Sequence, residues 1–334
     1  MHRCGHPRIH PPIARFGQPG DGRRGDRATA LKSHDRGRPR DGPLPLPREQ
    51  DTRALCAVVA RSSPRGNPMS GRRGSTMAVI QARMSSARLP GKVLLPLAGE
   101  PMIVRQLERT ARASTLDRIV VATSTDPGDD QLADVLTGAG IEVMRGPLED
   151  VLTRYQQAIE TYRPDVVVRM TADCPLISPA IIDHVVQAFH ASDADYVSNT
   201  MQPTYPDGQD VEVVTAGVLQ EAAATFTDPH EREHVTLGIY RRPEHFAIEN
   251  VIDPTGRDNS HLRWTVDTPE DYHFAEAVYA NLYANNPAFE YDHILALLAD
   301  MPEITRTEDD AARNAALDGL DTGVMHHRDQ GSAP

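Results

Sequence analysis

The sequence predicts a single α/β domain with a mostly parallel sheet and helices on both of its faces. Three observations predict this fold class. Short runs rich in Val, Ile and Ala alternate with amphipathic stretches from residue 77 onward, as strands alternate with crossover helices in a parallel sheet. Polar segments with Gly and Pro separate the runs. The chain has 334 residues, of which 39% are hydrophobic, and this is enough to bury a full-sized core.

The first half of the domain contains four strand–helix repeats. The strands are predicted at 77–81, 118–124, 141–145 and 165–170, and the helices at 102–114, 129–140, 149–162 and 179–192. β-Branched residues dominate the strands, whereas apolar residues recur every three or four positions in the helices. The second of these helices closes on Gly138 or Gly140. Because parallel strands need a helix-sized crossover, the repeats predict parallel pairing.

The second half has a less regular pattern. We predict strands at 205–214, 246–252 and 261–267, and helices at 230–242, 268–283 and 291–301. Pro269 suits the first turn of the helix that it opens. The folded domain is predicted to span residues 77–304, followed by a polar flexible tail over 305–334.

The first 76 residues differ in composition from the rest. They contain 16 Lys and Arg against 6 Asp and Glu, together with 10 Pro and 10 Gly and a single aromatic residue. Such a segment has too little apolar surface to offset the entropy lost on ordering, so residues 1–76 are predicted to be a disordered leader. We expect it to be upstream sequence included by an early start, with the working chain beginning near Met69 or Met77. A basic arm for nucleic acid is the alternative.

Charge and cysteine content narrow the class of protein. Residues 77–334 hold 19 basic against 41 acidic side chains, which would repel a nucleic acid except at local basic loops. Cys174 is the only cysteine in this range, so neither an internal disulfide nor a cysteine metal cluster can form there. No apolar stretch reaches the roughly 18 residues of a membrane span. These features predict a cytoplasmic domain that binds neither nucleic acid nor membrane, and they leave a homodimer open.

The loop after the first strand is strongly cationic. In the stretch QARMSSARLPGK, Arg83 and Arg88 flank Ser85 and Ser86, and a Pro-Gly turn follows. Ligands of parallel α/β sheets bind beyond the carboxyl ends of the strands, where guanidinium forks and hydroxyls suit phosphate oxygens. The loop matches neither the dinucleotide G-x-G-x-x-G motif nor a P-loop, which needs Ser or Thr where Val93 stands. The sequence therefore predicts a phosphate site of another form, with a solvated basic loop as the alternative.

Lys92 closes this loop and is the only lysine between residues 77 and 334, where 18 arginines supply the other cations. Because the other cations of this range are all arginines, the single lysine indicates that a compact point charge is required at this position. We expect Lys92, with Arg83 and Arg88, to stabilise charge on a phosphate chain.

Two aspartates are candidate Mg²⁺ ligands because each follows a predicted strand. Asp173 comes after the strand at 165–170, and Asp267 ends the strand at 261–267. Mg²⁺ binds one or two carboxylates together with waters and phosphate oxygens, so this pair beside a phosphate loop predicts a metal site. Asp267 also precedes Thr-Pro-Glu-Asp, which is typical of a helix N-cap, and both interpretations stay open.

Other clusters compete for the role of metal site. Asp193 and Asp195 form a D-x-D of the kind that holds a metal in nucleotide-sugar-dependent glycosyltransferases, but they precede a strand instead of following one. The acidic loop at 126–130 is predicted to be a solvated turn and helix start. His230 and His234 lack the H-E-x-x-H order of a zinc protease.

Five segments, in this order and at these spacings, resemble one enzyme family: IQARMSSARLPGKVL, TADCPLI, YPDGQDVEVV, REHVT and LRWTVDTPEDY. They resemble the cytidylyltransferases that activate acidic sugars, in particular the spore-coat polysaccharide biosynthesis cytidylyltransferase-like proteins, which are similar to the CMP-KDO and acylneuraminate cytidylyltransferases. The resemblance covers about residues 77–300. It implies a Rossmann-like, mostly parallel sheet of the nucleotide-diphospho-sugar transferase type.

The resemblance also implies roles for single residues. The cationic loop of such enzymes binds CTP, and the aspartates that correspond to Asp173 and Asp267 hold Mg²⁺. The KDO enzymes typically have Glu where Cys174 stands, so their sugar specificity is not carried over. The nucleotide-binding set implied for this chain is Ala82, Arg83, Ser85, Ser86, Arg88, Lys92 and Thr123.

Together these features predict a Mg²⁺-dependent nucleotidyltransferase that couples CTP to a sugar, an acidic one by resemblance. The products are a CMP-sugar, for surface polysaccharide or glycoconjugate biosynthesis, and pyrophosphate. Candidates for the sugar side are Asp210, Glu212, Glu233 and His234, whose alternative role is surface charge. A glycosyltransferase that uses the D-x-D motif is one alternative function, and a non-catalytic nucleotide-binding domain is another.

Overall fold

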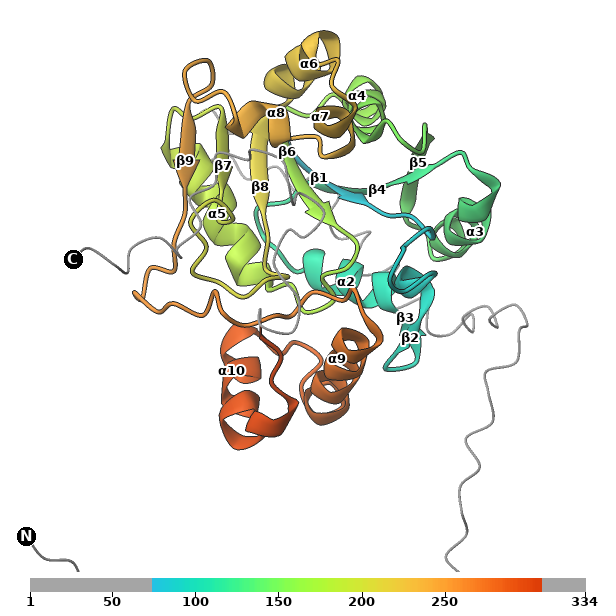
Figure 1. Cartoon of the computed structure of the whole chain (residues 1–334), viewed down its shortest axis with the longest axis vertical. Coiled ribbons are helices and arrows are strands. Elements are labelled where there is room, and N and C mark those ends of the chain that lie inside the picture. Colours follow the sequence, from blue (N-terminus) through green and yellow to red (C-terminus); the bar gives the residue numbers. More distant parts are fainter. Residues whose placement is uncertain (1–73, 308–334) are drawn as a thin grey trace, which may run out of the picture. The chain divides into compact units, whose positions relative to one another are not determined.

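The computed structural model describes residues 74–307, which fold around a seven-stranded sheet with the strand order β5-β4-β1-β6-β8-β7-β9 (Figure 1). The strands are β1 Thr76–Gln81, β4 Arg118–Ser124, β5 Glu142–Gly146, β6 Val166–Thr171, β7 Tyr196–Ser198, β8 Glu212–Thr215 and β9 Ile248–Asn250. β1 pairs in parallel with β4 and β6, whereas β8 runs antiparallel to both of its neighbours. The predicted α/β fold with a mostly parallel sheet is confirmed. The predicted leader and tail lie outside the described residues, apart from 74–76 and 305–307.

Helices cover both faces of this sheet because its central strands are apolar on both sides. In β1, Ala78 and Ile80 face one core cluster, and Met77 and Val79 face the other. The first cluster is covered by α2 Met102–Thr110, α3 Asp130–Gly138, α5 Pro179–Ala191, α9 Pro269–Leu282 and α10 Tyr291–Asp300. The second is covered by α4 Val151–Tyr162, α6 Ala216–Thr225 and α8 Leu237–Tyr240. Figure 1 shows α4, α6 and α8 above the strands and α2, α9 and α10 below them.

The chain reverses its direction of travel across the sheet between β1 and β6. From β1 it moves outward to β4 and β5, and it then returns to β6 on the other side of β1. Such a switch point opens a crevice at the carboxyl ends of the two strands. The loop at 82–91 and the loop at 172–178 both start there.

The predicted strand at 261–267 is wrong. Leu262, Trp264 and Val266 are buried and alternate as in a strand, but this segment makes only isolated bridges. Its backbone is held by loops instead: the N–H of Trp264 donates to the carbonyl of Asp207 at 2.7 Å. Gly208, at φ +101°, permits this close approach, because a Cβ there would lie 2.6 Å from the backbone nitrogen of Thr265.

The other differences concern the extent of elements. The strand predicted at 205–214 is confined to β8, and the strand predicted at 246–252 to β9. The helix predicted at 230–242 is two short helices, α7 Pro229–Glu233 and α8, separated by Val235 at φ +55°. A β-branched residue in this conformation is rare and interrupts the helix. None of the helices found between residues 74 and 307 is long and apolar enough to span a bilayer.

Candidate functional site

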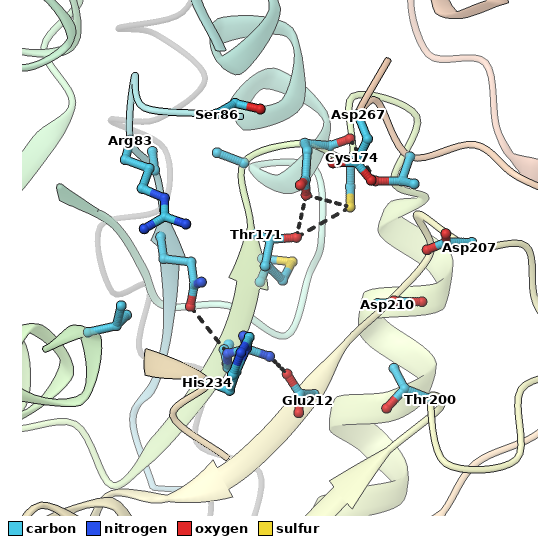
Figure 2. A pocket seen from close by; sticks show the side chains of 18 of the residues that line it. Arg83, Ser86, Thr171, Cys174, Thr200, Asp207, Asp210, Glu212, His234 and Asp267 are labelled. Carbon is cyan, nitrogen blue, oxygen red and sulfur yellow. Dashed lines mark hydrogen bonds and ion pairs between the residues drawn. The ribbon is translucent and has the colours of Figure 1, made fainter. Parts of the chain in front are cut away.

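A pocket of about 660 Å³ lies at the carboxyl end of the central strands. Its walls come from the loops after β1 and β6, from β8, from α4, from the segment between α7 and α8, and from the segment 263–267. Figure 2 shows Arg83, Asp267 and Glu212 on different sides of this pocket. The pocket is where the sheet topology predicts a ligand.

The cationic loop has a defined backbone shape. The carbonyl of Met84 accepts from the N–H of Ser86 at 3.0 Å and from the N–H of Gly91 at 2.9 Å, which closes the loop on itself. Gly91 has φ +72°, a conformation that favours glycine, and it precedes the short 3₁₀ helix Lys92–Leu94. The turn therefore ends by pointing Lys92 into the protein.

Asp129 anchors this loop from β4's side of the sheet. Its Oδ1 accepts from the backbone N–H of Met84 at 2.7 Å, and its Oδ2 accepts from the hydroxyl of Ser124. Asp129 is buried, with only 2% of the residue exposed. The prediction that the acidic loop at 126–130 is a solvated turn is therefore wrong for this residue. Asp126 does cap the short helix that follows it.

The Lys92 ammonium joins the two candidate metal ligands. It donates to Asp173 Oδ2 at 3.0 Å, to Asp267 Oδ1 at 2.9 Å and to the carbonyl of Val266 at 2.8 Å. These bonds use all three N–H groups of a residue that is 8% exposed. The residues that sequence reasoning assigned to phosphate and metal thus form one cluster, which we call the lysine–aspartate centre (Lys92, Asp173 and Asp267).

The charges of this centre stabilise one another. Burial alone would lower the pKa of Lys92, but the carboxylates of Asp173 and Asp267 outweigh burial and raise it. Burial alone would raise the pKa of Asp173, but the ammonium of Lys92 and the hydroxyl of Thr171 outweigh it and lower the pKa. Near neutral pH the lysine is therefore charged and Asp173 is ionised.

Asp267 is not the helix cap that its sequence context allowed. Thr268 caps α9, in a capping box with Asp271. The carboxylate of Asp267 instead meets Arg88 at 2.9 Å and Arg263 at 2.8 Å, besides Lys92. The backbone N–H of Val266 donates to the carbonyl of Asp173 at 2.8 Å, and this bond brings the two aspartates together although 261–267 is not a strand.

The lysine–aspartate centre fits Mg²⁺ by the chemistry of its donors. Asp173 and Asp267 both line the pocket, and their side chains keep 25% and 20% of their exposure. Within residues 74–307 no group of three or more His, Cys, Asp or Glu side chains could hold a metal. Mg²⁺ needs only one or two carboxylates when phosphate oxygens and waters complete its shell, so two aspartates suffice.

Only some of the other residues predicted to bind the nucleotide line the pocket. Ala82, Arg83, Ser86 and Arg88 line the pocket. Arg83 is partly exposed and lies 3.5 Å from Glu233, a weak ion pair that leaves its guanidinium available to a ligand. Ser85 is exposed and is not part of the pocket wall. Thr123 is fully buried in β4 and does not line the pocket either.

All four sugar candidates, Asp210, Glu212, Glu233 and His234, line the pocket. Glu212 on β8 is the most constrained, since it forms an ion pair with Arg169 and accepts from the hydroxyls of Tyr196 and Thr236, each at 2.6 Å. Arg169 is therefore largely neutralised by its partner on the neighbouring strand. This end of the pocket presents carboxylates and hydroxyls held in place by a buried network.

His234 follows α7 and faces this network (Figure 2). Burial and the nearby charge of Arg169 lower its pKa, which keeps the imidazole neutral at pH 7.

The D-x-D motif, Asp193 and Asp195, lies outside the pocket. Asp195 precedes β7, and its Oδ2 accepts from the backbone N–H of Ala247 at 2.9 Å. Neither Asp193 nor Asp195 lines the pocket. The arrangement gives no support to a glycosyltransferase that would use this motif.

Comparison with known proteins finds similar sequences over the folded part of this chain. The family model described as Cytidylyltransferase matches residues 77–297. The spore coat polysaccharide biosynthesis protein SpsF of Bacillus subtilis is 33% identical over 232 residues, which are 67% of this chain and 94% of the relative. The 3-deoxy-manno-octulosonate cytidylyltransferase of Syntrophotalea carbinolica is 37% identical over 250 residues, covering 61% of this chain and 98% of the relative.

A solved structure is also similar. The cytidylyltransferase of Leptospira borgpetersenii serovar Hardjo-bovis superposes with a TM-score of 0.66 at 31% identity, covering 70% of this chain and 97% of that chain. The family match includes the cationic loop, the lysine–aspartate centre and the sugar candidates. This chain therefore belongs to the cytidylyltransferase family.

Proposed function

We propose that this protein transfers a cytidylyl group from CTP to a hydroxyl of an acidic sugar, with Mg²⁺ as the metal. The observation that carries the proposal is the lysine–aspartate centre beneath a cationic loop, in a pocket large enough for a nucleotide and a sugar. The relatives named for 3-deoxy-manno-octulosonate cytidylyl transfer and for spore coat polysaccharide biosynthesis support an acidic sugar and a role in surface polysaccharide synthesis.

In this reaction a sugar hydroxyl oxygen forms a bond to the α-phosphorus of CTP. The bond from that phosphorus to the bridging oxygen of the β-phosphate breaks, pyrophosphate leaves, and the hydroxyl proton passes to a base or to water. Such chemistry depends mainly on positioning and on stabilising negative charge. Mg²⁺ bound at Asp173 and Asp267 would supply charge neutralisation at the phosphates.

The chain's own cations act around the same point. Arg83 and Arg88 are the partly exposed cations of the loop, and they would bind oxygens of the leaving pyrophosphate. Lys92 keeps the two carboxylates together and offsets their mutual repulsion, so that they face one ligand. Glu212, held by Arg169, and His234 would orient the sugar hydroxyls from the opposite wall.

The experiment is a pyrophosphate-release screen of the four ribonucleoside triphosphates against a panel of sugar acids and neutral sugars, with and without Mg²⁺. The proposal predicts release that requires CTP, a sugar acid and the metal together. Release of a nucleoside diphosphate from a nucleotide sugar, with no pyrophosphate, would contradict it. CTP binding without turnover on any sugar would favour a non-catalytic nucleotide-binding domain.

A further inference from the structure

Arg154 is a buried cation in the pocket wall that the reaction described above does not use. It lies on α4 and is 2% exposed. Its Nη1 donates to the carbonyl of Ala122 at 3.2 Å and its Nη2 to the carbonyl of Leu148 at 3.3 Å. Its Nε–H has no hydrogen-bond partner anywhere in residues 74–307. A buried donor of this kind is costly unless a ligand satisfies it.

Arg109 shows what a purely structural buried arginine looks like in this protein. It is also 2% exposed and also bonds only to carbonyls. Its Nε donates to Ile177 at 2.7 Å, its Nη1 donates to Phe289 at 2.9 Å, and its guanidinium stacks on the Phe289 ring. Arg109 lies outside the pocket, whereas Arg154 lines it. The N–H without a partner is therefore found on the arginine whose side chain contributes to the pocket wall.

Arg154 also differs from Arg169 and Arg263, which line the same pocket, in its charge balance. Arg169 pairs with Glu212, and Arg263 pairs with Asp207, Asp267 and Asp271. Arg154 has no carboxylate within ion-pair distance in the part of the chain that the structure describes. Burial lowers the pKa of Arg154, and the more distant carboxylates of Asp129 and Asp150 only partly offset this effect. The position favours a ligand group that accepts hydrogen bonds.

The strand order of the sheet indicates which part of CTP would lie near Arg154. Arg154 is held against the end of β4 by Ala122, on the side of β1 opposite to β6. The lysine–aspartate centre follows β6, and Glu212 lies one strand further, on β8. If the α-phosphate lies at this centre and the sugar lies toward β8, the nucleoside extends toward β4. Val151 and Ala82 line the pocket on that side and offer apolar contacts for a base.

We infer that Arg154 is a nucleotide-specificity residue, whose Nε–H donates to the acceptor edge of the cytosine ring, at O2 or N3. Cytosine presents two adjacent acceptors on that edge, and a fixed guanidinium donor is complementary to them. The inference rests on the proposed use of CTP, and it assigns the base end of the pocket to α4.

The test compares ligands that contain only one end of CTP. Binding of CMP and of inorganic tripolyphosphate is measured by calorimetry for the wild-type protein, Arg154→Met and Arg154→Lys. Arg109→Met is the matched control for loss of a buried arginine. Loss of a charged hydrogen bond predicts that both Arg154 variants bind CMP roughly 10- to 100-fold more weakly. Tripolyphosphate binding stays within about twofold of wild type, and Arg109→Met lowers the melting temperature without changing CMP affinity.

Three results separate the explanations. Weaker tripolyphosphate binding with unchanged CMP binding would make Arg154 a phosphate contact and overturn the inference. Unchanged binding of both ligands would make it a structural arginine like Arg109. Arg154→Lys keeps the charge in the pocket wall, so it decides the question if Arg154→Met does not fold. A wild-type protein that binds neither CMP nor CTP would contradict the proposed function itself, before any variant is compared.

Discussion

Replacing Lys92 with Met tests how the lysine–aspartate centre is held together. The substitution keeps the length and apolar stem of the side chain and removes the ammonium that bonds to Asp173, Asp267 and the Val266 carbonyl. Two carboxylates would then face each other across the pocket without the charge between them. We expect both stability and activity to fall.

The magnitude follows from burial and from the remaining partners. Removing one partner of a buried ion pair costs about 3–5 kcal/mol. Two features reduce the cost here: the Asp173 and Asp267 side chains remain 25% and 20% exposed, and Arg88 and Arg263 still neutralise Asp267. We therefore expect a loss of about 2 kcal/mol, which lowers the melting temperature of a domain of this size by roughly 4–8 °C. The kcat/KM for CTP should fall roughly 10²-fold or more.

The assays are thermal unfolding with and without Mg²⁺, and pyrophosphate release. Mg²⁺ should raise the melting temperature of Lys92→Met more than that of the wild type, because the variant leaves Asp173 without its cationic partner. Arg118→Met, which removes an exposed ion pair with Glu142, is the control and should cost less than about 1 kcal/mol. Wild-type stability and rate in Lys92→Met would refute the view that this lysine organises the site.

Three further substitutions test the supports of the site. Asp129→Ala removes the acceptor for the Met84 N–H and should raise the KM for CTP roughly tenfold in steady-state kinetics; an unchanged KM would show that the loop keeps its shape alone. Gly91→Ala forces a Cβ onto φ +72° with no clash closer than 3.5 Å, so backbone strain alone should cost about 1 kcal/mol in denaturant unfolding. Asp150 caps α4, and although burial opposes ionisation, the Thr153 N–H and Arg232 lower its pKa. Its contribution to stability is therefore complete above the ordinary carboxyl pKa and lost as the pH falls below about 4, so the melting temperature of Asp150→Asn should vary less over that range than that of the wild type.

Most of the fold could be predicted because periodicity reports burial directly. β1, β4 and β6 are apolar on both faces, as central parallel strands between two helix layers must be. These three strands and the edge strand β5 each lie within a residue or two of the prediction. The same reasoning wrongly predicted a strand at 261–267, and the cause is physical. This segment alternates because alternate side chains enter the core, but its N–H groups bond to loop carbonyls, and no local pattern distinguishes those partners from a neighbouring strand.

The candidate site could be predicted in part. Lys92 stood out through composition, and Asp173 through its place after a strand, and the structure brings both to Asp267. Asp129 was missed because a helix-start aspartate looks the same whether or not it binds a distant loop. The role of Arg154 could have been suspected from the sequence. Arg154 lies three residues after Val151 and four before Ala158, on the apolar face of α4, where a charged residue is rarely found without a binding partner.

The most direct test of the central claim is the Mg²⁺ dependence of pyrophosphate release from CTP in the wild type, Asp173→Asn, Asp267→Asn and Asp195→Asn. If Asp173 and Asp267 hold the metal, each of the first two variants needs more Mg²⁺ for half-maximal rate and loses roughly 10²-fold or more in turnover. Asp195→Asn should match the wild type, because the Asp195 side chain lies outside the pocket and accepts a hydrogen bond from the backbone N–H of Ala247. A silent Asp173→Asn beside an inactive Asp195→Asn would contradict the account.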